Sequence, residues 1–348
     1  MAVNKRMNKA KTSKNDEFYT RLEDIESELR HYKEHFKDKV VLCNCDDPRV
    51  SNFTRYFVLN FEFLGLKKLI CTCYKNAEPE LFSRNESESA IYMVYEGDKD
   101  GNRKADENEY QINHLKGDGD FRSVECIELL KEADIVVTNP PFSLMKEYML
   151  QLLQYNKKFL ILGSMNTIHY TEIFPYIQRG ELWLGYGANK TMTFALPDHY
   201  EKWNEIIDGV KYGKVPSICW FTNLDTKKRH EDLILYRHYS PEEYTKYDNF
   251  DAIEVKKVND IPCDWDGMMG VPDSFLGVYN PEQFEILGAD CIPEYAERLG
   301  IRRIGEEWMA RYRAAGGTGH YTANMKSLVI TEKGKPKKVF SRIIIRRR

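Results

Sequence analysis

The chain has 348 residues, which is enough for one large domain or two ordinary ones with an ample core. A hydrophobic content of 42% and a charged content of 30% are typical of a soluble globular protein. No apolar run is long enough to span a bilayer, and the N-terminus lacks the apolar core of a signal peptide, so we expect a cytoplasmic protein without a membrane partner.

The formal net charge of −3 is not typical of a nucleic-acid-binding protein, but the charge is unevenly distributed. Residues 1–14 form a basic arm that ends at Lys14 and contains no acidic residue. Such tails contact phosphates without making the whole protein basic, and a solvated or disordered tail is the alternative. Basic residues also crowd the C-terminus: Lys333, Lys335, Lys337, Lys338, Arg342, Arg346, Arg347 and Arg348.

The eight cysteines do not have the spacing of a metal site. Cys43 and Cys45 lie on one face of a predicted strand, as do Cys71 and Cys73, because side chains alternate along a strand. A zinc site prefers two-residue gaps between cysteines or nearby histidines, and neither is present. We therefore expect reduced cysteines in the core and no bound metal.

The N-terminal part of the chain alternates helices and strands. Apolar residues spaced by three and four from Leu22 to Phe36 predict an amphipathic helix. Strands are expected over residues 40–44 and 68–73. The helix between them is expected to open at Asp46-Asp47-Pro48, where a carboxylate near the N-cap and a proline in the first turn favour a helix start.

A polar stretch and a glycine-rich loop come next. Strands at residues 92–96 and 110–114 are expected to form a surface hairpin. The loop of residues 117–123 contains Asp120 and precedes a helix over residues 124–131. Since Asp and Asn are common helix caps, a capping role for this loop is one interpretation of it.

The stretch from residue 133 to residue 142 is the most informative one. It reads as a buried strand, residues 134–138, followed by Asn139-Pro140-Pro141-Phe142. Four β-branched or small residues in a row suit a central parallel strand that is covered on both faces. Proline cannot donate to a sheet ladder, so the prolines lie beyond the carboxyl end of the strand, where open α/β sheets bind ligands.

Those residue types suit activation of an exocyclic amine on a nucleobase for attack on an electrophile. Such an amine is a poor nucleophile because its lone pair is delocalised into the ring. The side-chain oxygen of Asn139 and the carbonyl of Pro140 can accept its two N–H protons and draw the nitrogen toward tetrahedral geometry. The prolines fix the backbone, and Phe142 offers a face for stacking. A plain strand-terminating turn is the alternative.

The remaining elements continue the alternation to about residue 200. Helices are expected over residues 144–154 and 170–177, with a strand over 159–163 between them. Residues 182–186 and 192–197 are expected to be the last strands of the sheet. Together the elements predict an α/β fold with a doubly wound, mostly parallel sheet.

Several separate blocks resemble the EcoRI-type adenine-specific DNA methyltransferases, and the resemblance covers most of the chain. Asn139-Pro140-Pro141-Phe142 resembles the catalytic motif of amino-methyltransferases that use S-adenosylmethionine. The other blocks are Asn15-Asp16-Glu17-Phe18-Tyr19-Thr20, the stretch from Cys43 to Phe53, Gly117-Asp118-Gly119-Asp120-Phe121-Arg122-Ser123, Lys246-Tyr247-Asp248-Asn249 and Met269-Gly270-Val271-Pro272.

The resemblance implies a Rossmann-like S-adenosylmethionine-dependent methyltransferase fold in residues 15–200, followed by a DNA-recognition region in residues 201–348. It implies transfer of a methyl group to N6 of an adenine flipped out of double-stranded DNA. It also implies a restriction-modification role, with a restriction endonuclease as a possible partner and GAATTC as a first sequence to test. Segment 289–317 departs from the family pattern.

The resemblance assigns roles to individual residues. The cofactor-binding candidates are Phe18, Tyr19, Thr20, Asn44, Asp46, Asp47, Asp120 and Phe121. The usual Gly-x-Gly turn of a Rossmann fold is missing after the first strand, and Asp46 is preferred over Asp47 as the partner of the cofactor's ammonium group because Asp47 is better placed as a helix cap.

The resemblance also suggests contacts with DNA. Phe142 and Phe194 are expected to stack on the flipped base from opposite sides, while an ordinary core position is the alternative for Phe194. Lys14 and the cluster Lys227-Lys228-Arg229 are candidate phosphate contacts, and a solvated charge run is the alternative for the cluster.

Two other functions remain open from the sequence. The same catalytic motif serves enzymes that methylate an RNA base or a protein glutamine. A protein that binds DNA or S-adenosylmethionine without turnover is a third possibility, against which the intact Asn139-Pro140-Pro141-Phe142 motif argues.

Overall fold

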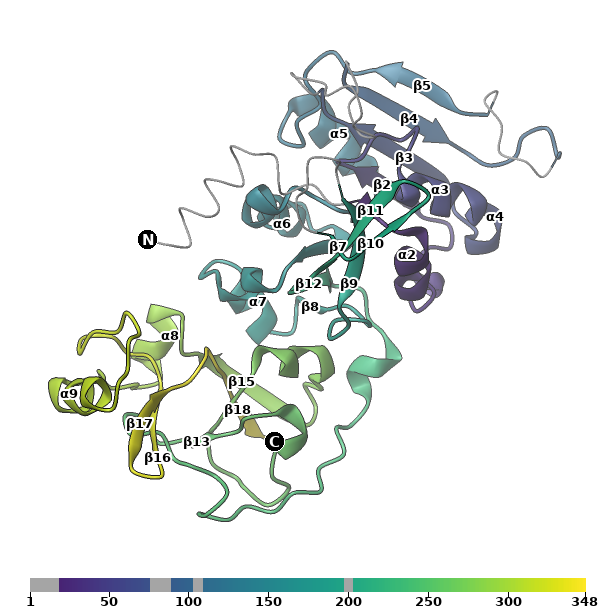
Figure 1. The fold of residues 1–348 in the computed structure, drawn as a ribbon. Coiled ribbons are helices and arrows are strands. Elements are labelled where there is room, and N and C mark those ends of the chain that lie inside the picture. Colours follow the sequence, from purple (N-terminus) through teal and green to yellow (C-terminus); the bar gives the residue numbers. More distant parts are fainter. Residues whose placement is uncertain (1–18, 76–88, 103–108, 197–202) are drawn as a thin grey trace. The chain divides into compact units, whose positions relative to one another are not determined.

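The computed structural model describes residues 19–75, 89–102, 109–196 and 203–348 (Figure 1). The expected basic arm of residues 1–14, with Lys14, lies outside the described residues, and so does the cofactor-binding candidate Phe18. The chain divides into two compact units, of which unit 1 extends to Thr167 and includes Leu184–Thr226. Unit 2 comprises Ile168–Trp183 and Lys227–Arg348. Within the described residues, no helix is both long and apolar enough to cross a membrane.

Unit 1 is built around an eight-stranded sheet with the order β5-β4-β3-β2-β6-β7-β12-β8. The four middle strands, β3, β2, β6 and β7, run parallel to one another. Their residues are almost all buried, as expected for parallel strands that are covered on both faces. The bounds are β2 (Val40–Asn44), β3 (Lys68–Cys73), β4 (Ile91–Tyr95), β5 (Gln111–His114), β6 (Ile135–Thr138), β7 (Lys158–Ser164), β8 (Trp183–Leu184) and β12 (Ile218–Thr222).

The helices of unit 1 include the connections between these parallel strands. The bounds are α2 (Leu22–Leu29), α3 (Asn52–Leu59), α4 (Phe61–Leu64), α5 (Val124–Glu132) and α6 (Met145–Gln154). The prediction that Asp46-Asp47-Pro48 opens a helix is wrong. Ser51 is the N-cap of α3, and its hydroxyl accepts a hydrogen bond from the amide of Phe53 at 3.2 Å. The Asp47 carboxylate instead accepts hydrogen bonds from Arg49, which closes a turn before the helix.

The strand order places a topological switch point between β2 and β6. From β2 the chain crosses to β3 on one side, continues to the antiparallel strands β4 and β5, and then returns to β6 on the other side of β2. Val41 pairs with Ile135 and Leu42 with Val136 across this junction. The crevice beyond the carboxyl ends of two such strands is where doubly wound folds bind ligands.

The last strands of the large sheet differ from the prediction. β9 (Met192–Leu196) does not join it but lies in an antiparallel sheet with the order β1-β9-β11-β10. The position beside β7 belongs to β12, from the region expected to recognise DNA. Every residue of β12 is buried, whereas β9 alternates buried and half-buried residues, so only β12 suits a sheet interior. The other bounds are β1 (Tyr19–Thr20), β10 (Glu205–Ile207) and β11 (Val210–Val215).

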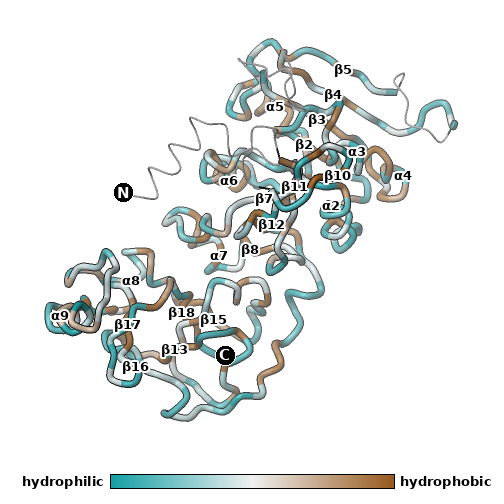
Figure 2. Tube along the Cα trace, in the orientation of Figure 1, coloured by the Kyte–Doolittle hydropathy of each residue, from teal (hydrophilic) through white to brown (hydrophobic). Residues whose placement is uncertain are grey.

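Unit 2 contains a four-stranded sheet with the order β13-β14-β18-β15 and a separate hairpin of β16 and β17. The expected C-terminal strand is β18, whose Ile343, Ile344 and Ile345 are fully buried and give it the brown colour in Figure 2. The bounds are β13 (Ile253–Glu254), β14 (Met269–Val271), β15 (Phe284–Ala289), β16 (Val329–Glu332), β17 (Lys335–Lys338), β18 (Ile343–Arg347), α7 (Phe174–Gln178), α8 (Pro293–Arg298) and α9 (Glu306–Ala314).

Two of the sequence blocks stabilise unit 2. Glu254 is buried, and both its oxygens accept hydrogen bonds from the guanidinium of Arg342, while the hydroxyl of Tyr247 donates a further one. A Cβ atom on Gly270 would overlap the ring of Tyr247, so only glycine fits there. Asn249 binds the carbonyls of Arg302 and Ser327. Blocks 246–249 and 269–272 therefore have a clear structural role.

Candidate active site

The carboxyl ends of β2 and β6 are joined at the switch point by side-chain contacts. The hydroxyl of Thr138, the last residue of β6, donates a hydrogen bond to the backbone carbonyl of Asn44, the last residue of β2. Both residues are buried. Asn139-Pro140-Pro141-Phe142 therefore begins at the crevice between the two strands, where the sequence placed it.

The segment after β6 is held in a fixed conformation. Pro140 is buried, and Asn139, Pro141 and Phe142 are half-buried. The carbonyl of Pro141 accepts a hydrogen bond from the amide of Leu144 at 2.9 Å, which forms a short 3-10 turn before α6. The ring of Phe142 packs against the hydrophobic core of unit 1.

Tyr148 connects α6 to the candidate cofactor region, and sequence reasoning missed it. Its side chain is fully buried, and its hydroxyl donates a hydrogen bond to the side-chain oxygen of Asn44. Burial raises the pKa of Tyr148 well above its ordinary value, so the hydroxyl stays protonated as a donor. Its ring meets the ring of Phe121 edge to face, with centroids 5.1 Å apart. The sequence signal was a tyrosine on the apolar face of a predicted helix, which also describes ordinary core residues.

The turn after β2 has the backbone conformation that a glycine usually provides. Cys45 has a φ of 88°, a left-handed value that is uncommon for a residue with a side chain. Such strain is often found at functional sites. Asp46 follows and is half-buried, with one oxygen 3.2 Å from the hydroxyl of Ser51. The side chain of Asp47 is only 4% exposed and pairs with Arg49, so Asp46 is the more accessible carboxylate.

Strand β1 brings the N-terminal block to the same end of the sheet. The side-chain amide of Asn52, in the first turn of α3, donates a hydrogen bond to the carbonyl of Thr20 at 2.8 Å. Thr20 pairs with Phe194 of β9, next to Tyr19, for which only the strand position is described. The hydroxyl oxygen of Thr20 is buried and has no hydrogen-bond partner among the described residues. A buried hydroxyl of this kind fits a ligand that supplies the missing partner.

The loop with Asp120 and Phe121 lies against the end of β3. The amide of Lys75 donates to the carbonyl of Asp118 at 2.6 Å. Gly119 has a φ of 78°, and a Cβ atom there would lie 2.6 Å from the carbonyl oxygen of Cys73, so this close approach requires glycine. Ser123, not Asp120, is the N-cap of α5.

Asp120 is ionised and bound to a neighbour in this structure. Hydrogen bonds from the side chain of Arg122, outweighing partial burial, hold the pKa of Asp120 below its ordinary value. The guanidinium of Arg122 contacts both carboxylate oxygens, at 2.9 Å and 2.7 Å. Arg122 also reaches Glu147 of α6 at 3.0 Å, which links this loop to the helix after the Asn-Pro-Pro-Phe segment.

Phe194 is fully buried in the core of unit 1, in the cluster against which Phe142 packs. Stacking of Phe194 on a base therefore requires a rearrangement around it.

The loop that leads to β9 is anchored by Glu28 of α2. The buried carboxylate of Glu28 accepts hydrogen bonds from the amides of Tyr186 and Gly187, at 2.5 Å and 2.8 Å.

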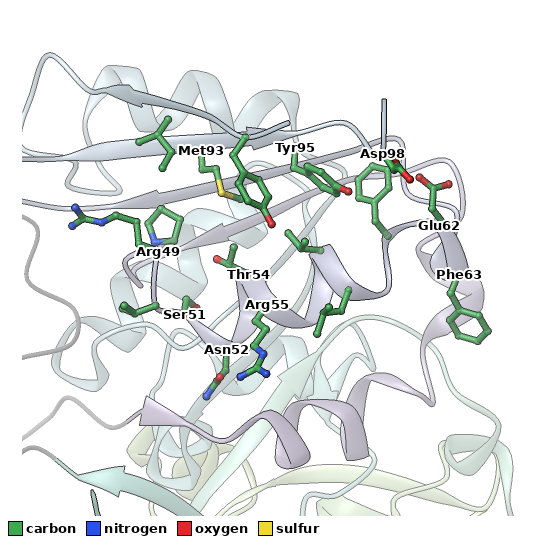
Figure 3. A pocket seen from close by; sticks show the side chains of 17 residues that line it. Arg49, Ser51, Asn52, Thr54, Arg55, Glu62, Phe63, Met93, Tyr95 and Asp98 are labelled. Atoms are coloured by element: carbon green, nitrogen blue, oxygen red, sulfur yellow. The ribbon is translucent and has the colours of Figure 1, made fainter. Parts of the chain in front are cut away.

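A pocket of about 1280 Å³ lies between α3 and β4 (Figure 3). Arg49, Ser51 and Asn52 line one end of it and Phe63 the other, so it extends along the outer side of α3. Asn139 and Phe142 do not line it. We therefore do not identify this pocket with the candidate active site.

The basic cluster of residues 227–230 forms a 3-10 turn in unit 2. Lys227 is exposed, and Lys228 is half-buried. The guanidinium of Arg229 lies 3.7 Å from the centre of the Trp183 ring and donates a hydrogen bond to the carbonyl of Gly180 at 3.2 Å. Arg229 thus has a structural role, and Lys227 is the most accessible candidate of the cluster for a phosphate contact.

Comparison with known proteins identifies the family of the chain. The family model for "Adenine-specific methyltransferase EcoRI" matches residues 6–348. The chain is 49% identical over 300 residues to Type II methyltransferase M.EcoRI of Escherichia coli, which covers 82% of this chain and 89% of that protein. It is 41% identical over 293 residues to Type II methyltransferase M.MgeORF184P of Mycoplasma genitalium, with coverages of 82% and 86%. No solved structure gave a significant match.

Proposed function

Because the chain belongs to the EcoRI family of adenine-specific methyltransferases, we propose that it is a site-specific DNA methyltransferase that transfers a methyl group to N6 of adenine. The observation that carries this proposal is the position of Asn139-Pro140-Pro141-Phe142. The segment leaves β6 at the topological switch point, beside the end of β2, and the helix α6 that follows it contacts the loop of Asp120 and Phe121.

The methyl donor in this proposal is S-adenosylmethionine. When bound, it supplies a methyl group on a positively charged sulfur. Asp46 is the accessible carboxylate for the ammonium group, and the hydroxyl of Thr20 gains the partner that it lacks among the described residues. Asp120 accepts a hydrogen bond from the amino group of the cofactor's adenine after Arg122 gives up one of its hydrogen bonds to Asp120. Phe121 borders the adenine ring of the cofactor.

The target base must leave the duplex, because its N6 atom is inaccessible inside the stack. In our proposal, the side-chain oxygen of Asn139 and the carbonyl of Pro140 accept the two N–H protons of the amine. Phe142 and, after rearrangement, Phe194 stack on the base and replace part of the stacking that flipping removes. Positioning of the amine then supplies most of the rate acceleration.

The proposal assigns DNA recognition to residues 201–348, most of which belong to unit 2. Residues 289–348 contain fourteen Lys or Arg and six Asp or Glu, a net charge of +8 in a chain whose total is −3. Exposed members of this set lie on α9 and on the β16–β17 hairpin, including Arg311, Lys333 and Lys335. A positive surface of this kind suits contact with the phosphate backbone.

The test is single-molecule sequencing of plasmid DNA from cells that express the protein, beside cells that express Asn139→Ala. We expect N6-methyladenine at one sequence motif, with GAATTC as the first to examine, and none in the variant. The variant Asn113→Ala, on the exposed strand β5, is the matched control and should methylate normally.

Unmodified DNA with the wild-type protein would overturn the proposal and direct labelled-methyl assays to RNA and protein glutamine. Near-normal methylation by Asn139→Ala would contradict the catalytic role of Asn139 alone. The relatives named as Type II methyltransferases also suggest a restriction-modification system, so protection of the methylated motif from a cognate endonuclease is the further expectation.

A further inference from the structure

Three side chains of unit 2 that commonly bind metals converge outside the candidate active site. They are His238, Cys263 and Asp264, and their ligand atoms all lie within 4.8 Å of one another. Nδ1 of His238 lies 2.9 Å from Oδ2 of Asp264 and 3.6 Å from Sγ of Cys263. The sequence pattern missed this group because 25 residues separate His238 from Cys263, which is unlike the spacing of common zinc motifs.

The backbone holds the two segments together without a metal. Arg237 pairs with Pro262 in an isolated parallel bridge, and the amide of Cys263 donates to the carbonyl of Arg237 at 2.8 Å. The amide of Tyr239 donates to Oδ1 of Asp264 at 2.7 Å. The ligand atoms are therefore positioned before any ion arrives, which lowers the entropic cost of binding.

The donor set and the sulfur–nitrogen distance match tetrahedral zinc. Imidazole, thiolate and carboxylate are the three zinc ligands of proteins, with Zn–S near 2.3 Å and Zn–N near 2.0 Å. At a tetrahedral angle these bond lengths place the sulfur and nitrogen roughly 3.6 Å apart. The distance between Cys263 Sγ and His238 Nδ1 has this value. A sulfur and an imidazole nitrogen are poor ligands for magnesium or calcium.

We propose that His238, Cys263 and Asp264 bind one Zn²⁺ ion, with water in the fourth position. The ion replaces the hydrogen bond between His238 and Asp264, whose nitrogen–oxygen distance widens by a few tenths of an ångström. Both side chains can adjust, because they are 77% and 46% exposed. The site ties residues 237–239 to residues 262–264.

The ion also stiffens an aromatic surface of unit 2. Tyr239 follows His238, and Trp265 follows Asp264, and the two rings have centroids 4.2 Å apart. Nζ of Lys246 lies 5.8 Å from the centre of the Trp265 ring. The site is thus a structural site whose ligands adjoin this aromatic pair in the chain, and the proposal does not depend on the methyltransferase assignment.

The experiment uses the full-length protein after metal removal by a chelator, titrated with Co²⁺ as a spectroscopic substitute for Zn²⁺. We expect one ion per chain, tetrahedral d–d absorption in the visible range and a thiolate-to-cobalt charge-transfer band. Added Zn²⁺ should displace Co²⁺ and abolish both signals. Circular dichroism of each variant verifies that it is folded.

The variants distinguish a specific metal site from nonspecific metal binding. Cys263→Ser should abolish the charge-transfer band, and Cys263→Ser, His238→Ala and Asp264→Asn should each weaken Zn²⁺ binding at least about tenfold. Cys291→Ser, which removes an exposed thiol elsewhere in unit 2, should bind normally. Absence of binding to the wild-type chain, or a signal that Cys263→Ser retains and Cys291→Ser loses, would overturn the proposal and leave a surface ion pair.

Discussion

The hydroxyl of Tyr148 donates a hydrogen bond to the side-chain oxygen of Asn44, and both side chains are buried. This contact joins the helix that follows Asn139-Pro140-Pro141-Phe142 to the strand that precedes the Asp46-Asp47 turn. The candidate catalytic segment and the proposed cofactor turn are therefore positioned by one shared contact, which neither residue's own sequence block reveals.

We expect Tyr148→Phe to destabilise the protein by about 1–3 kcal/mol, because the substitution leaves the Asn44 oxygen buried without its donor. S-adenosylmethionine binding should weaken as the turn after β2 loosens. Urea unfolding and calorimetric titration measure the two effects. Tyr155→Phe, at the end of the same helix, is the control and should change neither. Unchanged stability and affinity in Tyr148→Phe would show that the contact has no positioning role.

Thr20→Val separates a cofactor contact from a structural one. Valine keeps the shape and the β-branched character that suit strand β1, but it removes the buried hydroxyl, which has no partner among the described residues. Without cofactor, we expect stability to stay the same or to rise by up to about 1 kcal/mol. S-adenosylmethionine affinity should fall about tenfold, as loss of one hydrogen bond in a closed site predicts. A loss of stability without a loss of affinity contradicts the assignment.

The sequence predicted the parallel core of unit 1 well. The bounds of β2 and β3 agree with the prediction, because runs of buried apolar residues between polar turns are distinctive. The prediction of sheet membership was wrong for β9 and β12. The alternation around Phe194 and the apolar run around Trp220 do not indicate which sheet each strand joins. That choice depends on contacts between distant residues.

The candidate site was predictable only in part. Asn139 and Phe142 stand out because a proline pair ends a buried strand. Tyr148 and the metal-site candidate His238 do not stand out, because their partners are distant in sequence: Tyr148 meets Asn44 across 104 residues. Asp47 was expected to be a helix cap, but Arg49 and Ser51 offer closer local contacts and shift the helix start to Asn52.

A half-buried ion pair in unit 2 predicts a pH dependence of stability. Nε2 of His169 lies 3.2 Å from Oδ2 of Asp273. Burial lowers the pKa of His169, but Asp273 and the neighbouring Cys291 outweigh it and raise the pKa to about 10. Because the folded-state pKa exceeds the ordinary value of about 6.5, protonated His169 stabilises the fold. That contribution is complete below pH about 6.5 and is lost as the pH rises through about 10.

We therefore expect the unfolding free energy of the wild type to fall, relative to His169→Gln, between pH about 6.5 and about 10. Urea unfolding across this range measures the difference. His320→Gln, at an exposed position of unit 2, is the control. A difference that does not change with pH would mean that His169 is not the titrating group.

The hairpin of β16 and β17 offers a direct test of where DNA phosphates bind. Lys333, Lys335 and Lys337 are exposed along its turn and second strand. Replacing all three by alanine should weaken binding to specific and unrelated duplexes by a similar factor, because phosphate contacts carry no sequence information. The slope of log affinity against log salt should decrease by about 0.9 for each contact that is lost.

The matched control removes the same number of charges from another surface. Lys33, Lys37 and Lys39 are exposed in unit 1, near the end of α2, and their replacement by alanine should leave the salt slope unchanged. Fluorescence anisotropy with labelled duplexes at several salt concentrations measures both variants. Equal slopes for the hairpin variant and the wild type would exclude the hairpin from the phosphate interface. A loss confined to one duplex sequence would instead identify the hairpin as a reader of bases, since only base contacts distinguish sequences at equal charge.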